Sequence, residues 1–422
     1  MQDNEKKPAL RFKGFTDPWE QRKLDEAFDF TVPNNTLSRA ELNQESGSVR
    51  NVHYGDVLIK YGSVLDAQND ELPFITGRSK DDFKGALLQN GDIIIADTAE
   101  DETTGKVCEI VNIQDKDVVA GLHTMVCRPK NKTAEGYFGY YMNSSSYHHQ
   151  LLPLMQGIKV LSLSKTNVQK TTVKYPKDKA EQQKIADCLR RIDTLITLHQ
   201  RKYEKLVNIK KSMLDKMFPK NGASVPEIRF KGFTDLWEQR KISELAEKTY
   251  GGGTPTTSNE AFWNGNIPWI QSSDIVDGKL MGVEPRKYIT QTGLNSSATQ
   301  LVPKNSIAII TRVGVGKLAY MPFSYSTSQD FLSLSKLNTE PFFTVYACYK
   351  KLQSELNTVQ GTSIKGITKD ELLAKTISVP VYSEQKQIGS FFAQLDTLIT
   401  LHQRKLEKLQ NIKKSCLEKM FV

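Results

Sequence analysis

The longest regular pattern of apolar residues in this chain is a heptad repeat, and it occurs twice. Apolar residues recur at alternating intervals of four and three over residues 185–217, and again over residues 388–420. This spacing puts one stripe of side chains along an α-helix and is typical of coiled coils. At ~1.5 Å per residue, about 37 residues make a rod of ~55 Å. The sequence therefore predicts two long helices that pair with each other, most simply in antiparallel orientation.

Both predicted helices carry a histidine in the apolar stripe, and their ends have recognisable signals. His199 and His402 occupy equivalent heptad positions, where a polar residue can fix the register at some cost in stability. Asp178 followed by Glu181 predicts a capping box at the start of the first helix. Ser383 is the predicted cap of the second helix, which has no matching acid.

The two predicted helices are part of a larger tandem duplication. RFKGFTDPWEQRK, which is Arg11–Lys23, returns as Arg229–Lys241 with one difference. The helical stretch Asp193–Phe218 returns as Asp396–Phe421 with four differences in 26 positions. We call the short repeated segments the tags and the chain between each tag and the following helix an insert. The inserts show almost no similarity to each other, so the chain has two similar frames around two divergent regions.

The inserts have the pattern of mixed α/β regions. Short apolar runs that follow polar turns predict strands at Val57–Ile59, Ile93–Ile95 and Ile307–Ile310. Gly251–Pro255 predicts a flexible turn before the aromatic segment Phe262–Trp269. Together with the long helices, these elements predict an α+β fold, with two mixed α/β inserts separated by two long antiparallel helices and related by a pseudo-two-fold duplication.

Composition and charge narrow the class of protein. A chain of 422 residues predicts two or more domains. It has neither an apolar run of the ~18–20 residues that span a bilayer nor a secretory signal, so we expect no membrane association. The cysteines are not spaced as CxxC, which favours reduced thiols in a cytoplasmic protein; they are Cys108, Cys127, Cys188, Cys348 and Cys416. The formal charge of +9 permits a polyanionic partner but also fits lysine-rich, solvated helix faces.

The sequence contains no pattern that predicts catalysis or metal binding. The histidines have no HExxH or other metal-ligand spacing, and His148–His149 is best interpreted as a surface pair. Val313–Leu318 contains a glycine-rich GVGK run, but it lacks the first glycine and the hydroxyl residue of a phosphate-binding P-loop. We therefore expect neither a catalytic residue nor a metal site in this chain.

Three features together resemble the specificity subunit of type I restriction–modification systems. Glu-Gln precedes each long helix, at Glu181–Gln182 and Glu384–Gln385. GGGTPTTSNEAFWNGNIPWIQSSDI, which is Gly251–Ile275, is similar to the opening of that family's target recognition domains. The order of tag, insert and helix then occurs twice. The first insert lacks the GGTP/IPW opening, so its assignment depends on its position between the repeats.

The resemblance implies a non-enzymatic, DNA-binding subunit of a restriction system. In that family, two target recognition domains each read one half of a split site in double-stranded DNA. The two similar helices dock two methyltransferase (modification) subunits, which carry out DNA methylation, and restriction subunits can join. The resemblance also implies that S-adenosylmethionine, ATP and Mg²⁺ belong to the partner subunits. The expected divisions are a tag at 1–23, a first target recognition domain at 24–176, a central helix at 177–222, a second tag at 223–242, a second target recognition domain at 243–380 and a C-terminal helix at 381–422.

Candidate DNA-contacting residues follow from side-chain chemistry alone. Arg, Lys, Asn and Gln read base edges or phosphates, and aromatic rings can stack on bases. In the first insert the candidates are Tyr54, Lys60, Tyr61, Arg78, His123, Arg128, Lys159 and Lys165. In the second insert they are Gly253, Thr254, Asn264, Trp269, Gln271, Arg312, Lys317, Gln329 and Lys365. For Trp269, burial in the core is the stronger alternative.

Two other functions compete with this interpretation. One is an adaptor or scaffold whose paired helices bridge two proteins and whose inserts bind peptides. It differs from the first hypothesis in predicting no salt-dependent binding to DNA. The other is a self-contained restriction enzyme, which the missing methyltransferase and nuclease motifs disfavour.

Overall fold

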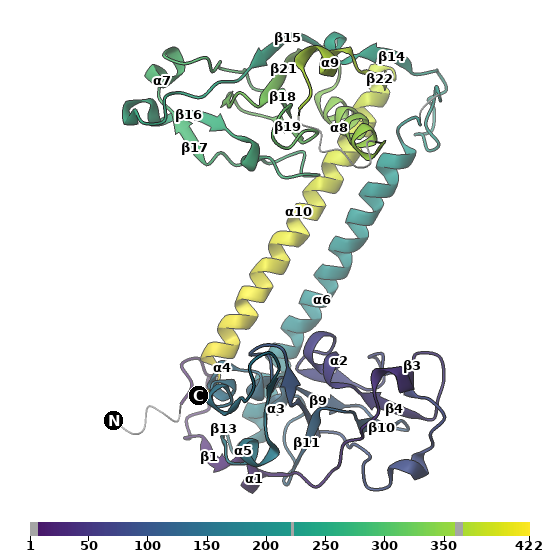
Figure 1. The fold of residues 1–422 in the computed structure, drawn as a ribbon, viewed down its shortest axis with the longest axis vertical. Helices are drawn as coiled ribbons and strands as arrows, with labels where there is room; N and C mark the ends of the chain where they lie inside the picture. Colours follow the sequence, from purple (N-terminus) through teal and green to yellow (C-terminus); the bar gives the residue numbers. More distant parts are fainter. Residues whose placement is uncertain (1–6, 221–222, 359–365) are drawn as a thin grey trace. The chain divides into compact units, whose positions relative to one another are not determined.

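The chain folds into two units, each containing one tag, one insert and parts of both long helices (Figure 1). The structure is a computed structural model and describes residues 7–220, 223–358 and 366–422. Unit 1 comprises residues 1–198 and 406–422, and unit 2 comprises residues 199–405. The long helices are α6 (Lys179–Lys216) and α10 (Tyr382–Lys419).

Unit 1 contains a central antiparallel sheet with one parallel edge strand. Its strand order is β2-β11-β7-β9-β5, and a second sheet has the order β10-β4-β6-β3. The bounds are β1 (Glu20–Lys23), α1 (Leu24–Ala27), β2 (Phe28–Asp29), β3 (Leu42–Asn43), β4 (Val49–Val52), α2 (Tyr54–Ile59), β5 (Val64–Asp66), β6 (Phe74–Ile75), β7 (Ile93–Ala96), β8 (Thr98–Ala99), β9 (Val107–Val111), β10 (Asp117–Ala120), β11 (Thr124–Pro129), α3 (Tyr137–Met142), α4 (Ser145–His148), β12 (Leu161–Ser162), α5 (Lys165–Gln169) and β13 (Thr172–Tyr175).

Unit 2 repeats the central sheet in shorter form, with the order β15-β21-β18-β19. The insert of unit 2 also forms a three-stranded sheet, β17-β16-β20, where the insert of unit 1 forms its second sheet. The bounds are β14 (Glu238–Lys241), β15 (Ala246–Gly251), β16 (Trp263–Ile270), β17 (Lys287–Ile289), α7 (Gln291–Asn295), β18 (Ser306–Ile310), β19 (Leu318–Met321), β20 (Ser326–Thr327), β21 (Phe331–Leu337), α8 (Pro341–Thr358), α9 (Lys369–Ala374) and β22 (Thr376–Val379).

Each tag is joined to the start of a long helix. The last residues of the tags form β1 and β14, which pair antiparallel with β13 and β22, the strands that lead into α6 and α10. In unit 1, Arg11 donates to both carboxylate oxygens of Glu181, at 2.7 and 2.8 Å. In unit 2, Arg229 makes the same pair of bonds with Glu384. These bidentate contacts explain why the tags and the Glu-Gln pairs are repeated together.

The predicted helix caps were wrong in detail. Asp178 does cap α6, since its Oδ1 accepts from the backbone N–H of Ala180 at 2.7 Å. Glu181 makes no capping box, however, because its buried carboxylate is taken by the guanidinium of Arg11, a stronger partner than a backbone N–H. Ser383 is not a cap either, because α10 already begins at Tyr382.

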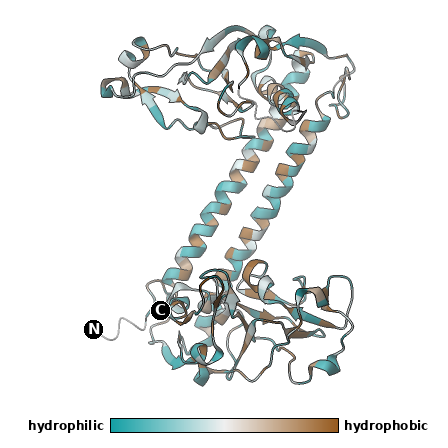
Figure 2. Cartoon of the chain, viewed as in Figure 1, coloured by the Kyte–Doolittle hydropathy of each residue, from teal (hydrophilic) through white to brown (hydrophobic). Residues whose placement is uncertain are grey.

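Within each unit the two long helices run antiparallel, as predicted, and hydrophobic and hydrophilic residues alternate along both (Figure 2). In unit 2, residue numbers rise along α6 as they fall along α10: Nδ1 of His199 lies 2.8 Å from Nδ1 of His402, and Lys210 pairs with Asp396 at 2.5 Å. In unit 1 the repeated pair is Lys413 with Asp193, at 2.6 Å. The apolar stripe therefore lies between the helices.

The strand predictions were correct for the central sheets and wrong at one place. Ile93–Ile95 lies in β7 and Ile307–Ile310 in β18, and each is an interior strand of the central sheet of its own unit. Val57–Ile59 belongs instead to α2, because His53 caps a helical turn by accepting from the N–H of Gly55 at 3.1 Å. The predicted α+β class with two long antiparallel helices is confirmed. Among the described residues, no helix is long and apolar enough to cross a membrane.

Candidate nucleic-acid interface

Three of the candidate residues of unit 1, Tyr54, His123 and Lys159, lie on segments that meet where β7 ends and β11 begins. There the N–H of Asp97 donates to the carbonyl of His123 at 3.1 Å, and the carbonyl of Asp97 accepts from Leu163 at 2.8 Å. The chain before Leu163 forms a hairpin, residues 156–162, whose strand β12 pairs with β8. We call this region, with Tyr54, Asp97, Thr98, His123 and the hairpin, the strand-end surface of unit 1.

Unit 2 builds a corresponding surface from the same elements. The N–H of Thr311, directly after β18, donates to the carbonyl of Asp330 at 2.7 Å, and its own carbonyl accepts from Ile367 at 2.7 Å. Asp330 directly precedes β21, as His123 directly precedes β11. The strand-end surface of unit 2 comprises Thr254, Gln271, Arg312, Gln329 and Asp330. The unrelated sequences of the inserts therefore place their loops on the same framework.

The surface of unit 1 presents an imidazole flanked by a hydroxyl and a phenol. His123 is exposed and has a left-handed φ of 55°, which turns the chain sharply at the start of β11. Its Nδ1 lies 3.4 Å from Oγ1 of Thr98 and 3.5 Å from Oδ1 of Asp97. The ring of Tyr54 stands edge-on to it, with centroids 5.2 Å apart. These groups can donate to or accept from base edges.

The surface of unit 2 presents amides, a hydroxyl and a guanidinium. Oγ1 of Thr254 donates to Oε1 of the exposed Gln329 at 2.6 Å, and the Nε2 donors of this glutamine make no hydrogen bond with a described residue. Gln271 is adjacent because the N–H of Ser328 donates to the carbonyl of Ile270 at 2.9 Å. The exposed side chain of Arg312 makes no hydrogen bond or ion pair with any residue that the structure describes.

Other candidates of the first insert have structural partners. Tyr61 is buried, and its hydroxyl donates to the carbonyl of Glu71 at 3.1 Å, while burial raises the pKa of the phenol. Arg128 forms a bidentate ion pair with the buried Asp92, at 2.7 and 2.8 Å. Lys165 donates to the carbonyl of Phe30, and Lys60 donates to that of Glu71 at 2.8 Å. Arg78 and Lys159 lie exposed in loops.

The remaining candidates of the second insert divide in the same way. Trp269 is buried and donates to the carbonyl of Gly253 at 2.9 Å, so both maintain the turn after β15. Gly253 is closely packed, because a Cβ there would lie 2.5 Å from the backbone N of Thr299. Asn264 is exposed at an irregularity in β16, with a φ of 62°. Lys317 is partly exposed at the end of the Arg312 loop, and Lys365 lies outside the described residues.

The sequence interpretation missed several residues at or near these surfaces. In unit 1, Arg39 holds Asp56 of α2 with two bonds at 2.7 and 2.8 Å, yet half of its side chain is exposed. This guanidinium also lowers the pKa of His53, for which burial is the larger cause. In unit 2, the Lys287 ammonium lies 5.8 Å from the ring centroids of both Trp263 and Trp269. Trp263 lies within the motif that resembles the family and could have been selected on that ground.

In the described part of the chain, possible metal ligands do not cluster, and three of the thiols are buried. Among the described residues, no group of three or more His, Cys, Asp or Glu side chains could hold a metal ion. Burial raises the pKa of Cys108, Cys127 and Cys348, so these thiols are poor nucleophiles at neutral pH.

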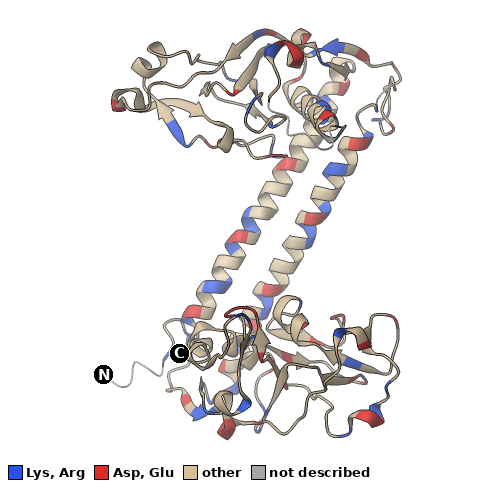
Figure 3. Cartoon of the chain, in the orientation of Figure 1, with Lys and Arg blue, Asp and Glu red and all other residues tan. Residues whose placement is uncertain are grey.

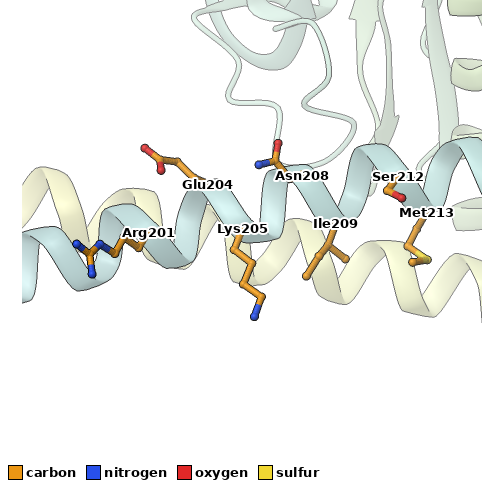
Figure 4. Close-up of a pocket in the computed structure, with 7 residues that line it drawn as sticks. All are labelled: Arg201, Glu204, Lys205, Asn208, Ile209, Ser212 and Met213. Carbon is orange, nitrogen blue, oxygen red and sulfur yellow. The ribbon is translucent and has the colours of Figure 1, made fainter. Parts of the chain in front are cut away.

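The long helices expose apolar side chains at repeated positions. Leu195 and Leu198 of unit 1 are 43% and 45% exposed, and their repeats in unit 2, Leu398 and Leu401, are 42% and 43% exposed. Basic and acidic residues occur along the same helices (Figure 3). In unit 2 a shallow groove along α6 mixes polar and apolar groups (Figure 4); it is lined by Arg201, Glu204, Lys205, Asn208, Ile209, Ser212 and Met213.

The chain resembles known proteins over almost its whole length. Residues 16–208 and 234–411 match the family described as "Type I restriction modification DNA specificity domain". The putative type I restriction enzyme MjaX specificity subunit of Methanocaldococcus jannaschii is 22% identical over 409 residues, which cover 94% of this chain and 91% of that protein. The EcoR124I/EcoR124II specificity subunit of Escherichia coli is 30% identical over 169 residues, 38% of this chain and 41% of that protein.

The fold has a counterpart among solved structures. The crystal structure of the type I restriction–modification S subunit from M. genitalium aligns over 99% of both chains, with a TM-score of 0.64 and 14% identity. At this level of identity the likeness supports the fold alone. The two family matches, one in each half, decide the assignment: the chain belongs to the type I restriction–modification DNA specificity family.

Proposed function

We propose that the chain is the specificity subunit of a type I restriction–modification complex and that each insert reads one half of a bipartite site in double-stranded DNA. One observation carries this proposal. The two units have the same central sheet order and the same backbone bonds at the ends of the strands, but different side chains on the strand-end surfaces. A common framework with different reading groups is what a protein needs to recognise two different half-sites.

The repeated helix surface supports two copies of one partner. Leu195 and Leu198 recur as Leu398 and Leu401 with nearly equal exposure, so two equivalent apolar surfaces are available. Identical partners need identical docking groups, whereas the inserts are free to diverge. We assign this surface to two methyltransferase subunits, with restriction subunits joining if the complex contains them.

The proposal gives the chain no catalytic step. The two surfaces supply hydrogen-bonding and stacking groups, and the described residues form no cluster suited to a metal ion. S-adenosylmethionine, ATP and Mg²⁺ then belong to the partner subunits. The chain would act in the cytoplasm, where the DNA is.

The geometry narrows the candidate base-reading residues to exposed groups and the half-buried Tyr54 and Gln271. In unit 1 these are Tyr54, Arg78, His123 and Lys159, and in unit 2 they are Thr254, Gln271, Arg312 and Gln329. Tyr61, Arg128, Gly253 and Trp269 instead keep the loops in shape through the bonds described above. We assign these four residues a supporting role.

The test is to express the chain with its methyltransferase partner and map methylated adenines across a host genome. We expect a split, asymmetric motif with an unread spacer. His123→Ala should relax one half of the motif and Gln329→Ala the other, each by about 1–3 kcal/mol of discrimination. Gln239→Ala, on β14 of the second tag, is the matched control and should leave the motif unchanged.

A peptide-binding scaffold gives a different outcome in the same experiment. It predicts no methylation motif that depends on this chain, and no salt-dependent binding of the complex to DNA. A variant of either surface that alters both halves together would also contradict independent reading by the two units.

A further inference from the structure

The hairpin of the unit 1 surface has a precisely constrained tip. Gln156 and Ser162 exchange backbone bonds at 3.0 and 2.8 Å and close the hairpin. Gly157 has a φ of +125°, and a Cβ there would lie 1.9 Å from the carbonyl oxygen of Val160. Only glycine fits this position. The β12 strand then fixes the hairpin to β8, directly beside Thr98 and His123.

This constrained tip presents an aliphatic side chain to solvent. Ile158 is 100% exposed, more than any other large apolar residue described in the chain, and Val160 is 51% exposed. A single exposed apolar residue is ordinary on a protein surface. Here, however, the side chain stands at the end of a hairpin whose shape requires a glycine, on the surface that we assign to DNA.

We propose that Ile158 is an apolar wedge that inserts between neighbouring base pairs of the half-site read by unit 1. This inference rests on the proposed function. DNA-binding proteins use isolated Ile, Leu, Met or Phe side chains in this way, partly unstacking one base step and kinking the duplex. Sequence dependence then arises because base steps differ in how easily they unstack.

The small apolar area of the tip favours DNA over a protein as its binding partner. A stable protein interface buries about 1,000 Å² or more. The tip offers one fully exposed isoleucine and one half-exposed valine, which is far less than such an interface needs. One aliphatic side chain is, by contrast, the size of group that enters a single base step.

The charges around the tip also favour an apolar contact. Lys159 is exposed next to Ile158 and can meet a phosphate. The loop after β8 carries Glu100, Asp101 and Glu102, which would repel the backbone on that side. Attraction to phosphates alone therefore does not explain an approach of this tip to DNA, whereas burial of Ile158 between bases adds a favourable contribution that does not depend on charge.

The test uses the full complex with its methyltransferase partner and duplexes that carry its mapped motif. On both strands of the unit 1 half-site, 2-aminopurine replaces each adenine and pyrrolocytosine replaces each cytosine, one position at a time. Both analogues keep the normal base pair and brighten when they are unstacked, so every base pair of the half-site is sampled. 2-Aminopurine at the position of the adenine that the methyltransferase flips out will also brighten. We expect a second bright position at a neighbouring step, which disappears in Ile158→Ala while the signal of the flipped adenine stays. Binding should weaken by about ten-fold, the scale expected for losing one buried aliphatic group.

Three matched variants isolate the apolar contact. Ile158→Leu should keep the second bright position, and Leu236→Ala, which removes a 71% exposed side chain from the second tag, should change nothing. Lys159→Gln should reduce the salt dependence of binding by about one phosphate contact and keep the unstacking. A second bright position that survives Ile158→Ala, or the absence of any such position, overturns the wedge. A complex that shows no split motif overturns the proposed function, and the wedge with it.

Discussion

The two units share the contacts around their helices and differ in the loops beyond their sheets. Nε2 of Gln182 donates to the carbonyl of Pro176 at 2.8 Å, and its Oε1 accepts from the N–H of Ala134 at 3.0 Å. Gln385 makes the corresponding pair of bonds in unit 2, at 2.8 and 2.9 Å. Every repeated Glu-Gln pair thus anchors a tag on one side and an insert on the other.

A second shared contact joins each insert to both long helices. In unit 2 the hydroxyl of Tyr346 on α8 donates to Asp396 at 2.6 Å, and Asp396 pairs with Lys210. In unit 1 the hydroxyl of Tyr140 on α3 donates to Asp193 at 2.8 Å, and Asp193 pairs with Lys413. Sequences that diverge elsewhere keep a tyrosine here, because the phenol must reach a carboxylate that the repeated helix fixes.

The differences begin where no repeated residue makes contact. Unit 1 adds β5 and the β10-β4-β6-β3 sheet, whereas unit 2 adds the β17-β16-β20 sheet. These additions extend the inserts and supply Tyr54 in one unit and Gln271 in the other. The comparison indicates that contacts with the long helices constrain the insert residues that make them, whereas the residues of the strand-end surfaces are free to change.

The largest expected effect comes from exchanging a whole insert. Replacing residues 24–171, between β1 and β13, with the matching segment of a related subunit should change one half of the methylation motif completely. The other half should stay the same, because unit 2 keeps every residue of its own surface. Methylation mapping of the exchange strain gives the answer.

A second exchange refines the first. Keeping residues 156–162 of this chain within the foreign insert retains the Ile158 hairpin, and so tests whether that hairpin contributes to the new half-site. A change in both halves after either exchange would show that the units do not read separately.

Most of the framework could be predicted from the sequence because its signals are local or repeated. The heptads require only spacing, and the tags identify themselves by recurring. The two apolar runs at β7 and β18 were recognisable because central strands are buried on both faces. The run at Val57–Ile59 is also entirely aliphatic, but the cap made by His53 favours a helix there.

The candidate site could be predicted only in part, because surface and interior use the same polar groups. Arg128 has the chemistry of a base reader, and nothing near it in sequence reveals its ion pair with Asp92, 36 residues away. Lys165 donates a hydrogen bond to the carbonyl of Phe30, which is still more distant in sequence. Ile158 was not among the candidates because they were selected for polar or aromatic side chains.

The next largest effect should come from the ion pairs between the helices, which differ in burial. The side chains of Lys210 and Asp396 are 11% and 12% exposed, while those of Lys413 and Asp193 are 25% and 29% exposed. Lys210→Met should therefore cost about 3 kcal/mol of stability, because it leaves a desolvated carboxylate without its cation. Lys413→Met should cost about 1 kcal/mol.

Urea titrations followed by circular dichroism and tryptophan fluorescence measure both losses. Lys211→Met and Lys414→Met are the controls, since these neighbouring lysines are exposed repeats of each other and should cost almost nothing. Equal losses at Lys210 and Lys413 would mean that burial does not distinguish the two units.

The smallest expected effect concerns two glutamates that bind the first turns of α3 and α8. Glu109 accepts from the N–H groups of Gly136 and Gly139 at 2.6 and 2.9 Å, and Glu340 accepts from Phe343 at 2.6 Å. Glu109 is only 1% exposed and Glu340 8%. Burial raises the pKa of Glu109 from 4.5 to about 7, and it also raises the pKa of Glu340.

A carboxyl group with a raised pKa binds its proton more tightly in the folded state, so its contribution to stability is largest below pH 4.5 and is lost as the pH rises through about 7. Glu109→Gln keeps an oxygen acceptor and removes this titration. The Tm of Glu109→Gln minus the Tm of the wild type should therefore rise by a few degrees from pH 5.5 to pH 8. Glu340→Gln should show the same sign and a smaller rise, because Glu340 is buried less deeply. Thermal unfolding at the two pH values tests both, and a difference that falls with rising pH would mean that hydrogen bonding at the start of α3 outweighs burial.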